Sequence, residues 1–213
     1  MIFRLSETDI TFPNPDLAEE DGLLAIGGDL SVERLLLAYH LGIFPWYSED
    51  TPILWYSPHE PFVLYPEKVK ISKSMRNVLN SGRFSVTFDE AFQQVIEACA
   101  NVPRRGQPGT WLTKEMQEAY VELHRQGYAH SVEAWENGEL AGGLYGVLVN
   151  KVFCGESMFS RVPNTSKAAL IELCRNKNYE LIDCQMHTEH LESMGAEFIS
   201  REEYLALLRK AGG

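Results

Sequence analysis

Two short segments of the chain carry side chains that could do chemistry at the ends of predicted strands. Residues 153–161 combine a carboxylate, hydroxyls, a glycine and aromatic rings, a mixture that makes a poor hydrophobic core. Residues 181–185 place Asp183 and Gln185 at i and i+2, so both side chains should leave one face of the sheet about 6–7 Å apart. A buried carboxylate beside an amide needs partners, which are either a structural polar network or a substrate.

The composition limits the class of protein. The chain has 213 residues, 45% of them hydrophobic, which is enough for one full core and a small accessory domain. No apolar run reaches the ~20 residues of a membrane span, and the N-terminus lacks a basic region followed by an apolar one. We therefore expect a cytoplasmic protein without membrane contact. The four cysteines form no Cys-x-x-Cys pair and have apolar neighbours, which predicts buried free thiols.

The charge is unevenly distributed. A net charge of −11 argues against a polyanionic partner, because phosphate binding depends on Lys and Arg. Residues 67–83 reverse this sign locally with one acid against five cations, Lys68, Lys70, Lys73, Arg76 and Arg83, and Arg104 and Arg105 follow in a Pro/Gly-rich loop. The segment is either a solvated helix face or a basic strip that contacts phosphates. In the second case, the acidity of the rest of the protein would suit a cationic second substrate.

Prolines divide the chain into two parts. They are spread through residues 1–62 and exclude long elements there, so this part should be small and rich in loops. Its one clear helix should begin after Ser31 as N-cap and end before Gly42. Residues 42–47 then present aromatic side chains on a proline-containing turn.

From residue 61 onward the pattern alternates between strands and helices. We expect strands at 84–88, 129–136, 139–149, 152–158, 180–185 and 197–199, with a hairpin turn at Asn137-Gly138. Helices should follow Asp89 and Thr113 as caps, with further helices at 165–175 and 188–194 and a capping box from Ser200 to Glu203 before the last one. The fold class is therefore α/β (α+β), with a mixed sheet flanked by helices.

The order of these elements resembles the acetyltransferase-like (GNAT-like) fold of enzymes that use acyl-coenzyme A. In those enzymes a glycine-rich loop after the third meander strand offers backbone N–H groups to a pyrophosphate. Residues 160–166 contain no glycine, and Pro163 removes one donor. The loop thus argues against coenzyme A as the acyl carrier.

Nearly the whole chain resembles the leucyl/phenylalanyl-tRNA–protein transferase family of bacteria. The blocks that carry the resemblance are residues 22–30, 42–46, 109–113, 142–146, 153–161 and 182–185. The resemblance implies a small N-terminal domain, residues 1–62, and an acetyltransferase-like catalytic domain, residues 63–213. It also implies that Leu or Phe, and less readily Met, moves from its tRNA to the α-amine of a protein beginning with Arg or Lys, which creates an N-terminal degradation signal.

By the same resemblance, Asp183 and Gln185 are the catalytic pair. We hypothesise that the Gln185 carbonyl accepts a hydrogen bond from the attacking amine while Asp183 orients it. Glu156 matches the site glutamate of the family and could bind the amine or the cationic side chain of the acceptor, with Ser157 and Ser160 nearby. Phe153 and Glu156 would face opposite sides of a regular strand, so a site lined by both predicts a bulge at Gly155.

The remaining expectations concern the aminoacyl-tRNA. Trp46 and Trp111 match positions that hold the terminal adenosine in the family, although a generic Trp is more often part of the core, where we expect Trp55 and Trp135. Leu144 and Leu173 match the apolar pocket for the aminoacyl side chain. With a tRNA substrate implied, Lys73, Arg76 and Arg83 gain weight as contacts to the tRNA backbone, because phosphate contacts position a substrate without reading its sequence.

No cofactor or metal is expected. An aminoacyl ester is already activated, and the sequence has no P-loop. Cys184, His187 and His190 lack the further ligands and the spacing of a zinc site. Two alternatives from other classes remain, an acyl-coenzyme A N-acyltransferase and a non-catalytic module that binds tRNA or degradation signals.

Overall fold

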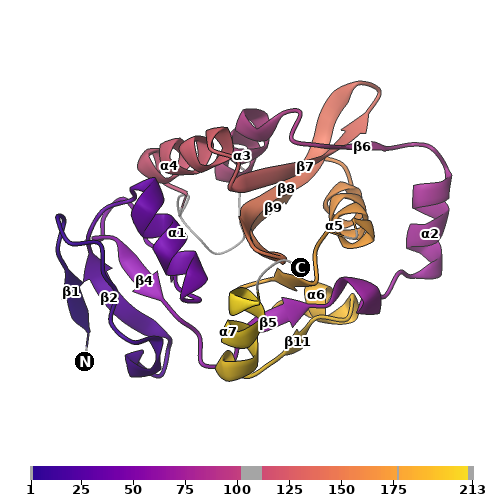
Figure 1. Ribbon diagram of the computed structural model, residues 1–213. Coiled ribbons are helices and arrows are strands. Elements are labelled where there is room, and N and C mark those ends of the chain that lie inside the picture. Colours follow the sequence, from indigo (N-terminus) through magenta and orange to yellow (C-terminus); the bar gives the residue numbers. More distant parts are fainter. Residues whose placement is uncertain (1, 102–111, 177, 211–213) are drawn as a thin grey trace.

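The computed structural model describes residues 2–101, 112–176 and 178–210 and places them in two sheets with surrounding helices (Figure 1). The smaller sheet has the strand order β1-β2-β4-β3, and the larger sheet has the order β11-β5-β10-β9-β8-β7-β6. The strands are β1 Phe3–Leu5, β2 Leu23–Gly27, β3 Phe44–Pro45, β4 Leu54–Tyr56, β5 Phe62–Leu64, β6 Ser85–Phe88, β7 Ala129–Glu136, β8 Glu139–Val149, β9 Val152–Ser160, β10 Leu181–Asp183 and β11 Glu197–Phe198.

Helices lie on both faces of the larger sheet, with α3 and α4 on one side and α5 on the other (Figure 1). The helices are α1 Val32–His40, α2 Lys73–Asn80, α3 Phe92–Asn101, α4 Lys114–Arg125, α5 Thr165–Arg175, α6 Glu189–Ser193 and α7 Arg201–Arg209, with 3-10 turns η1 Pro15–Leu17 and η2 Pro66–Lys68. This mixed architecture confirms the predicted fold class. Among the described residues, every helix is too short or too polar to cross a lipid bilayer.

The smaller sheet and α1 form the N-terminal part of the molecule, at the left of Figure 1. The Ser31 hydroxyl accepts the backbone N–H of Arg34, and Gly42 follows the helix with a φ of 68°. Both predicted ends of the helix are therefore confirmed. Trp55 is fully buried, as predicted, and its indole N–H donates to the Gly27 carbonyl over 2.8 Å.

In the larger sheet, β7, β8 and β9 form an antiparallel meander, and β10 then lies parallel to β9. Asn137 and Gly138 both have positive φ values, 53° and 82°, which is the backbone of the predicted two-residue hairpin turn. The predicted bounds of β7, β8 and α5 are confirmed. β5 pairs with β10 on its other side, so the short β10 lies inside the sheet.

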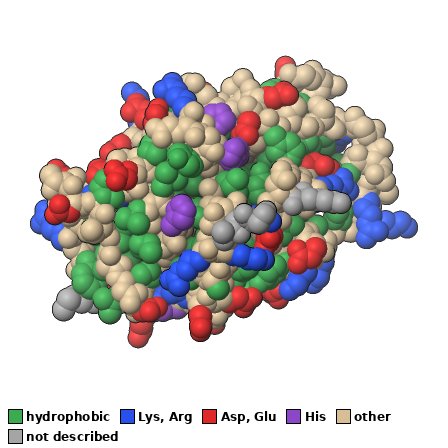
Figure 2. Space-filling view, in the orientation of Figure 1, with side chains coloured by type: hydrophobic (Ala, Val, Ile, Leu, Met, Phe, Trp, Pro, Cys, Tyr) green, Lys and Arg blue, Asp and Glu red, His purple; other side chains and the backbone are tan. Residues whose placement is uncertain are grey.

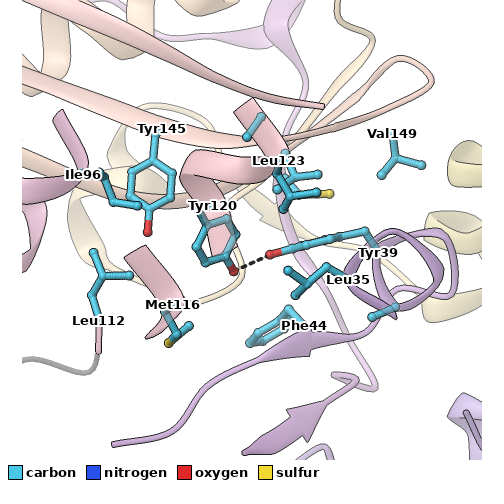
Figure 3. Close-up of a cluster of buried hydrophobic side chains, with 14 of the residues drawn as sticks. Leu35, Tyr39, Phe44, Ile96, Leu112, Met116, Tyr120, Leu123, Tyr145 and Val149 are labelled. Atoms are coloured by element: carbon cyan, nitrogen blue, oxygen red, sulfur yellow. Dashed lines mark hydrogen bonds between the residues drawn. The ribbon is translucent and has the colours of Figure 1, made fainter. Parts of the chain in front are cut away.

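One hydrophobic core joins the two sheets. Tyr39 on α1 points toward Tyr120 on α4, and their hydroxyl oxygens lie 2.6 Å apart (Figure 3). Buried apolar side chains from both parts pack around this pair, among them Leu35, Phe44, Ile96, Met116, Leu123 and Val149. The N-terminal part is thus packed directly against the helices that cover the larger sheet.

Several local predictions need correction. Asp89 does not cap α3, because its φ of 58° turns its carboxylate to the backbone N–H of Ser131 and to His130. Ser200 does cap α7, but the Glu203 carboxylate accepts the Tyr65 hydroxyl instead of closing the capping box. Trp135 is only partly buried, with its indole N–H on Thr87. The cysteines are free thiols, three buried and Cys184 half-buried.

Candidate active site

A cavity of about 440 Å³ lies where the short β10 ends beside the longer β9. The N-terminal part contributes the turn Phe44, Pro45 and Trp46, and the larger sheet, α5 and α6 contribute the rest. Of the predicted site residues, the cavity is lined by Trp46, Leu144, Phe153, Glu156, Ser157, Leu173, Asp183 and Gln185. Side chains from distant parts of the sequence therefore meet in one chamber.

A bulge in β9 turns Glu156 into this cavity. Gly155 pairs with Gly146 and Ser157 pairs with Tyr145, so Glu156 is one residue more than the partner strand matches. A Cβ atom at Gly155 would lie 3.1 Å from the Asp183 carbonyl oxygen, so the absence of a side chain lets the bulge approach β10 closely. The predicted bulge is confirmed, and it explains how Phe153 and Glu156 line the same chamber.

The Glu156 carboxylate accepts hydrogen bonds from three side chains. Tyr39 donates to Oε1 over 2.7 Å, Tyr120 to Oε2 over 2.9 Å, and the Gln185 amide to Oε1 over 2.7 Å. Because Nε2 is the donating end of the amide, the Gln185 carbonyl oxygen is the end left to accept from a ligand. Glu156 thus fixes which way the Gln185 side chain points.

Burial raises the pKa of Glu156 to about 7, even though its three hydrogen bonds favour the ionised form. Burial, and next the charge of Glu156, raises the pKa of both tyrosines well above its ordinary value, so they remain donors.

Asp183 and Gln185 are close together, but not as two residues on one strand face. β10 ends at Asp183, and Gln185 has a φ of 55°. The Asp183 Oδ1 atom accepts the backbone N–H of Gln185 over 2.8 Å, and its Oδ2 atom accepts the Tyr204 hydroxyl over 2.6 Å. The prediction of a strand through residue 185 is therefore wrong, because the Asp183 side chain bends the chain back on itself. Burial raises the pKa of Asp183, and these two hydrogen bonds oppose that rise.

Facing this polar group is a set of buried apolar side chains from β8, β9, β10 and α5. We call it the apolar wall, and it consists of Leu144, Phe153, Leu170, Leu173 and Ile182. The polar wall is Glu156, Asp183 and Gln185. Each member of the apolar wall is at most 3% exposed, so its shape is set by close packing around the cavity. A branched or aromatic side chain of a ligand fits such a surface.

The other predicted residues are placed differently. Trp46 is partly exposed and lines the cavity, while Trp111 lies outside the described residues. Lys73 and Arg76 are exposed on α2 and do not line the cavity. Helix α2 lies at the right of Figure 1, and the same side of Figure 2 shows Lys and Arg side chains in blue. Arg83 follows α2 and is paired with Glu136.

Sequence patterns alone missed Tyr39, Tyr120 and Tyr204. Each lies on the buried face of its helix, and periodicity therefore assigns it to the core. The available signal was chemical, because a buried Tyr needs a partner for its hydroxyl where a Phe does not. Here the partners are the two carboxylates of the polar wall.

No group of three or more His, Cys, Asp or Glu side chains in residues 2–101, 112–176 and 178–210 could hold a metal ion. The loop between β9 and α5 carries Asn164 with a φ of 77° and no side-chain cap on the helix. The buried Thr165 hydroxyl fills the start of α5, since a Cβ at Gly142 would lie 2.1 Å from its oxygen. The helix start is therefore packed tightly against β8.

A mixed sheet with a parallel β9–β10 pair, a bulged central strand and helices on both faces defines an acetyltransferase-like fold. The cavity lies in this sheet, where β10 ends beside β9.

Comparison with known proteins gives the particular family. The family model described as leucyl/phenylalanyl-tRNA protein transferase matches residues 63–209, and the model of its N-terminal domain matches residues 28–59. The transferase of Syntrophobacter fumaroxidans is 57% identical over 97% of this chain and 89% of its own length. That of an Anaeromyxobacter species is 54% identical over 99% of this chain and 90% of its own length. The chain belongs to the leucyl/phenylalanyl-tRNA–protein transferase family and is an aminoacyltransferase of that type.

Likeness to solved structures is more remote. A conserved protein of unknown function from Bacteroides thetaiotaomicron has a TM-score of 0.45 and 13% identity, over 71% of this chain and 55% of that chain. The family assignment rests on the sequence relatives.

Proposed function

We propose that this enzyme moves Leu or Phe, and less readily Met, from aminoacyl-tRNA to the α-amine of proteins that begin with Arg or Lys. The product would carry an N-terminal degradation signal. The observation that carries the proposal is the cavity itself, in which a fixed amide and two carboxylates face a closely packed apolar wall. An apolar aminoacyl side chain would rest on that wall while its ester faces the polar wall.

The reaction needs positioning more than activation. The α-amine nitrogen attacks the ester carbonyl carbon, the new C–N bond forms, and the bond to the ribose oxygen breaks, with one proton passing from the amine to the leaving hydroxyl. An N-terminal amine has a pKa of about 7.7–8.0, so a useful fraction is neutral near pH 7. Holding this amine beside the ester can supply much of the rate enhancement without ATP or metal.

We assign Gln185 to bind the attacking α-amine of the acceptor protein. Its Nε2 is held by Glu156, so its carbonyl oxygen can accept an N–H of the attacking nitrogen and direct the lone pair toward the ester. Asp183 orients Gln185 through the backbone N–H of the turn. Glu156 accepts three hydrogen bonds, one of which holds the Gln185 amide in place. In its ionised form it also adds negative charge near a cationic acceptor.

The tRNA would be held on both sides of the cavity. We assign Trp46, with Trp111, to the terminal adenosine, and Trp46 supports this as a partly exposed ring at the cavity. Lys73, Arg76 and Arg83 would contact phosphates farther along the tRNA, where they position without reading sequence. Residues 1–62 and 63–213 would act as two domains that share the cavity, to which the N-terminal turn contributes Trp46.

A transfer assay tests the proposal directly. Labelled Leu-tRNA or Phe-tRNA is mixed with peptides that differ only in an N-terminal Arg, Lys or Ala, and labelled peptide is measured. We expect product with Arg and Lys and little with Ala. No product with Arg or Lys would overturn the proposed acceptor class, and binding of aminoacyl-tRNA without any transfer would favour a non-catalytic module. A thermal shift with coenzyme A would instead favour an acyl-coenzyme A enzyme.

A further inference from the structure

Gln185 is held in an unusual backbone conformation. The backbone N–H of Met186 donates to the Cys184 carbonyl over 2.6 Å, which closes a three-residue γ-turn around Gln185. With a φ of 55° at its centre, this turn is of the rare, strained kind. Non-glycine residues adopt such conformations at a cost of about 1–3 kcal/mol, and only where the surroundings determine them. Something outside the turn must therefore hold it.

The direct holder is the Asp183 carboxylate. Its Oδ1 atom accepts the Gln185 backbone N–H over 2.8 Å, which leaves Oδ2 to a second donor. That donor is the Tyr204 hydroxyl, at 2.6 Å. Asp183 is 5% exposed, so solvent does not compete strongly for either oxygen. A phenol on the last helix thus fixes the carboxylate that fixes the turn.

Tyr204 is itself fixed by packing from the N-terminal part of the chain. Its side chain is 4% exposed, and a Cβ at Gly42 would lie 3.1 Å from its ring. Gly42 has a φ of 68°, so its lack of a side chain serves both the end of α1 and this close approach. The Cys154 thiol lies 3.8 Å from the hydroxyl and adds only a weak interaction.

We propose that Tyr204 is a positioning residue for aminoacyl transfer, whose hydroxyl holds Asp183 so that Gln185 stays in its strained turn with its amide at the reacting amine. Tyr204 lies outside the cavity lining and reaches the reaction only through Asp183. The inference rests on the proposed catalytic role of Gln185.

Tyr204→Phe removes the hydroxyl and keeps the ring that packs on Gly42. We expect kcat to fall roughly tenfold, the scale of removing one hydrogen bond to a charged group, with the KM for aminoacyl-tRNA unchanged. Removal of the donor also raises the pKa of Asp183, because the ionised carboxylate is left with one hydrogen bond fewer. The acid limb of the pH profile of kcat/KM should therefore move to higher pH, which a purely structural role would not cause.

The matched control is Tyr65→Phe. Tyr65 also donates its hydroxyl to a carboxylate, that of Glu203 on the same helix α7, over 2.7 Å, but it does not line the cavity. We expect this variant to keep the wild-type kcat and pH profile, with both melting temperatures recorded for comparison.

The outcomes distinguish a failure of the role of Tyr204 from a failure of the catalytic role of Gln185. If Gln185→Ala is inactive while Tyr204→Phe matches Tyr65→Phe in kcat and pH profile, the role of Tyr204 is refuted and the proposed function stands. If Gln185→Ala transfers at the wild-type rate, the catalytic assignment fails, and the role of Tyr204 fails with it. A slow Tyr204→Phe enzyme with a displaced acid limb, beside a normal Tyr65→Phe enzyme, supports the inference.

Discussion

Glu156, Asp183 and Gln185 in the polar wall are held by directed hydrogen bonds, whereas the apolar wall across the cavity is held by packing alone. Both oxygens of each carboxylate accept hydrogen bonds, and these bonds set the backbone and the amide of Gln185. The apolar wall offers volume and shape without preferred directions. A change of a single atom in the polar wall should therefore lower the rate of transfer. A change of volume in the apolar wall should be tolerated and should alter which substrate the cavity accepts.

The sharpest test of this difference is Gln185→Asn. Asn tolerates the left-handed backbone of the turn, so the fold should be kept, but its amide is one methylene too short to reach Glu156. We expect kcat to fall about 100-fold or more, with a melting temperature close to that of the wild type, because a small misplacement of a reacting group has an effect of this size. Single-turnover transfer measures the chemical step. A rate within about threefold of the wild type would show that the polar wall is no more exacting than the apolar one.

Glu156→Gln should have the next largest effect. The substitution keeps the size of the side chain but replaces a charged acceptor of three hydrogen bonds with one amide oxygen and an amide donor. We expect the transfer rate to fall on the order of tenfold, because the Gln185 amide is deprived of its charged anchor. Binding of aminoacyl-tRNA should be unchanged in a filter-binding assay. Weaker binding at an unchanged rate would instead place Glu156 against the tRNA substrate.

The same variant has a signature in stability. Burial raises the pKa of Glu156 in the folded protein to about 7 from 4.5, so the folded state binds its proton more tightly than the unfolded state. That contribution is fully present below about pH 4.5 and is lost as the pH rises through about 7. The melting temperature of the wild type relative to Glu156→Gln should therefore fall as the pH rises from about 4.5 to about 7, and it should level off above that. A constant difference across this range would contradict the raised pKa.

The sequence predicted the elements that carry local signals. The turn at Asn137-Gly138, the cap at Ser31 and the bounds of α5 all follow from neighbouring residues, and the structure has them. The bulge in β9 was also predictable, because Phe153 and Glu156 cannot share a side of a regular strand. Periodicity and turn chemistry were sufficient for the frame that positions the cavity.

The hydrogen bonds that fix the polar wall were not predictable in this way. They join residues far apart, such as Tyr39 with Glu156, separated by 117 positions, and Tyr120 with Glu156, separated by 36. A buried helix face shows only that a side chain is covered, not which carboxylate its hydroxyl meets. The turn at Gln185 was missed for a related reason. Residues 181–185 alternate as a strand does, but in the structure the Asp183 carboxylate accepts the backbone N–H of Gln185 and ends the strand.

On the apolar wall, Leu173→Ala should change selectivity more than rate. Leu173 is fully buried, so its truncation should destabilise the fold by about 2–5 kcal/mol and enlarge the chamber. We expect the ratio of kcat/KM for Phe-tRNA over Leu-tRNA to rise up to about tenfold, since a few methylenes in an apolar pocket discriminate by about 1–3 kcal/mol. Leu123→Ala, buried in the core away from the cavity, is the matched control for stability alone. An equal change of this kcat/KM ratio in both variants would show that the apolar wall does not determine selectivity.

The smallest effect should come from charges outside both walls. Lys73 and Arg76 are exposed on α2, where the first turn has no acid, so they add to the positive end of the helix dipole. For Lys73→Gln with Arg76→Gln we expect aminoacyl-tRNA binding to weaken a few-fold at physiological salt, with kcat unchanged. The slope of log K against log salt should become shallower by roughly one for each phosphate that the protein no longer neutralises. Lys68→Gln is the control, because Lys68 is already paired with Glu197. A salt slope equal to that of the wild type would show that α2 does not contact the tRNA phosphates. The cavity walls would then be the determinants of substrate binding.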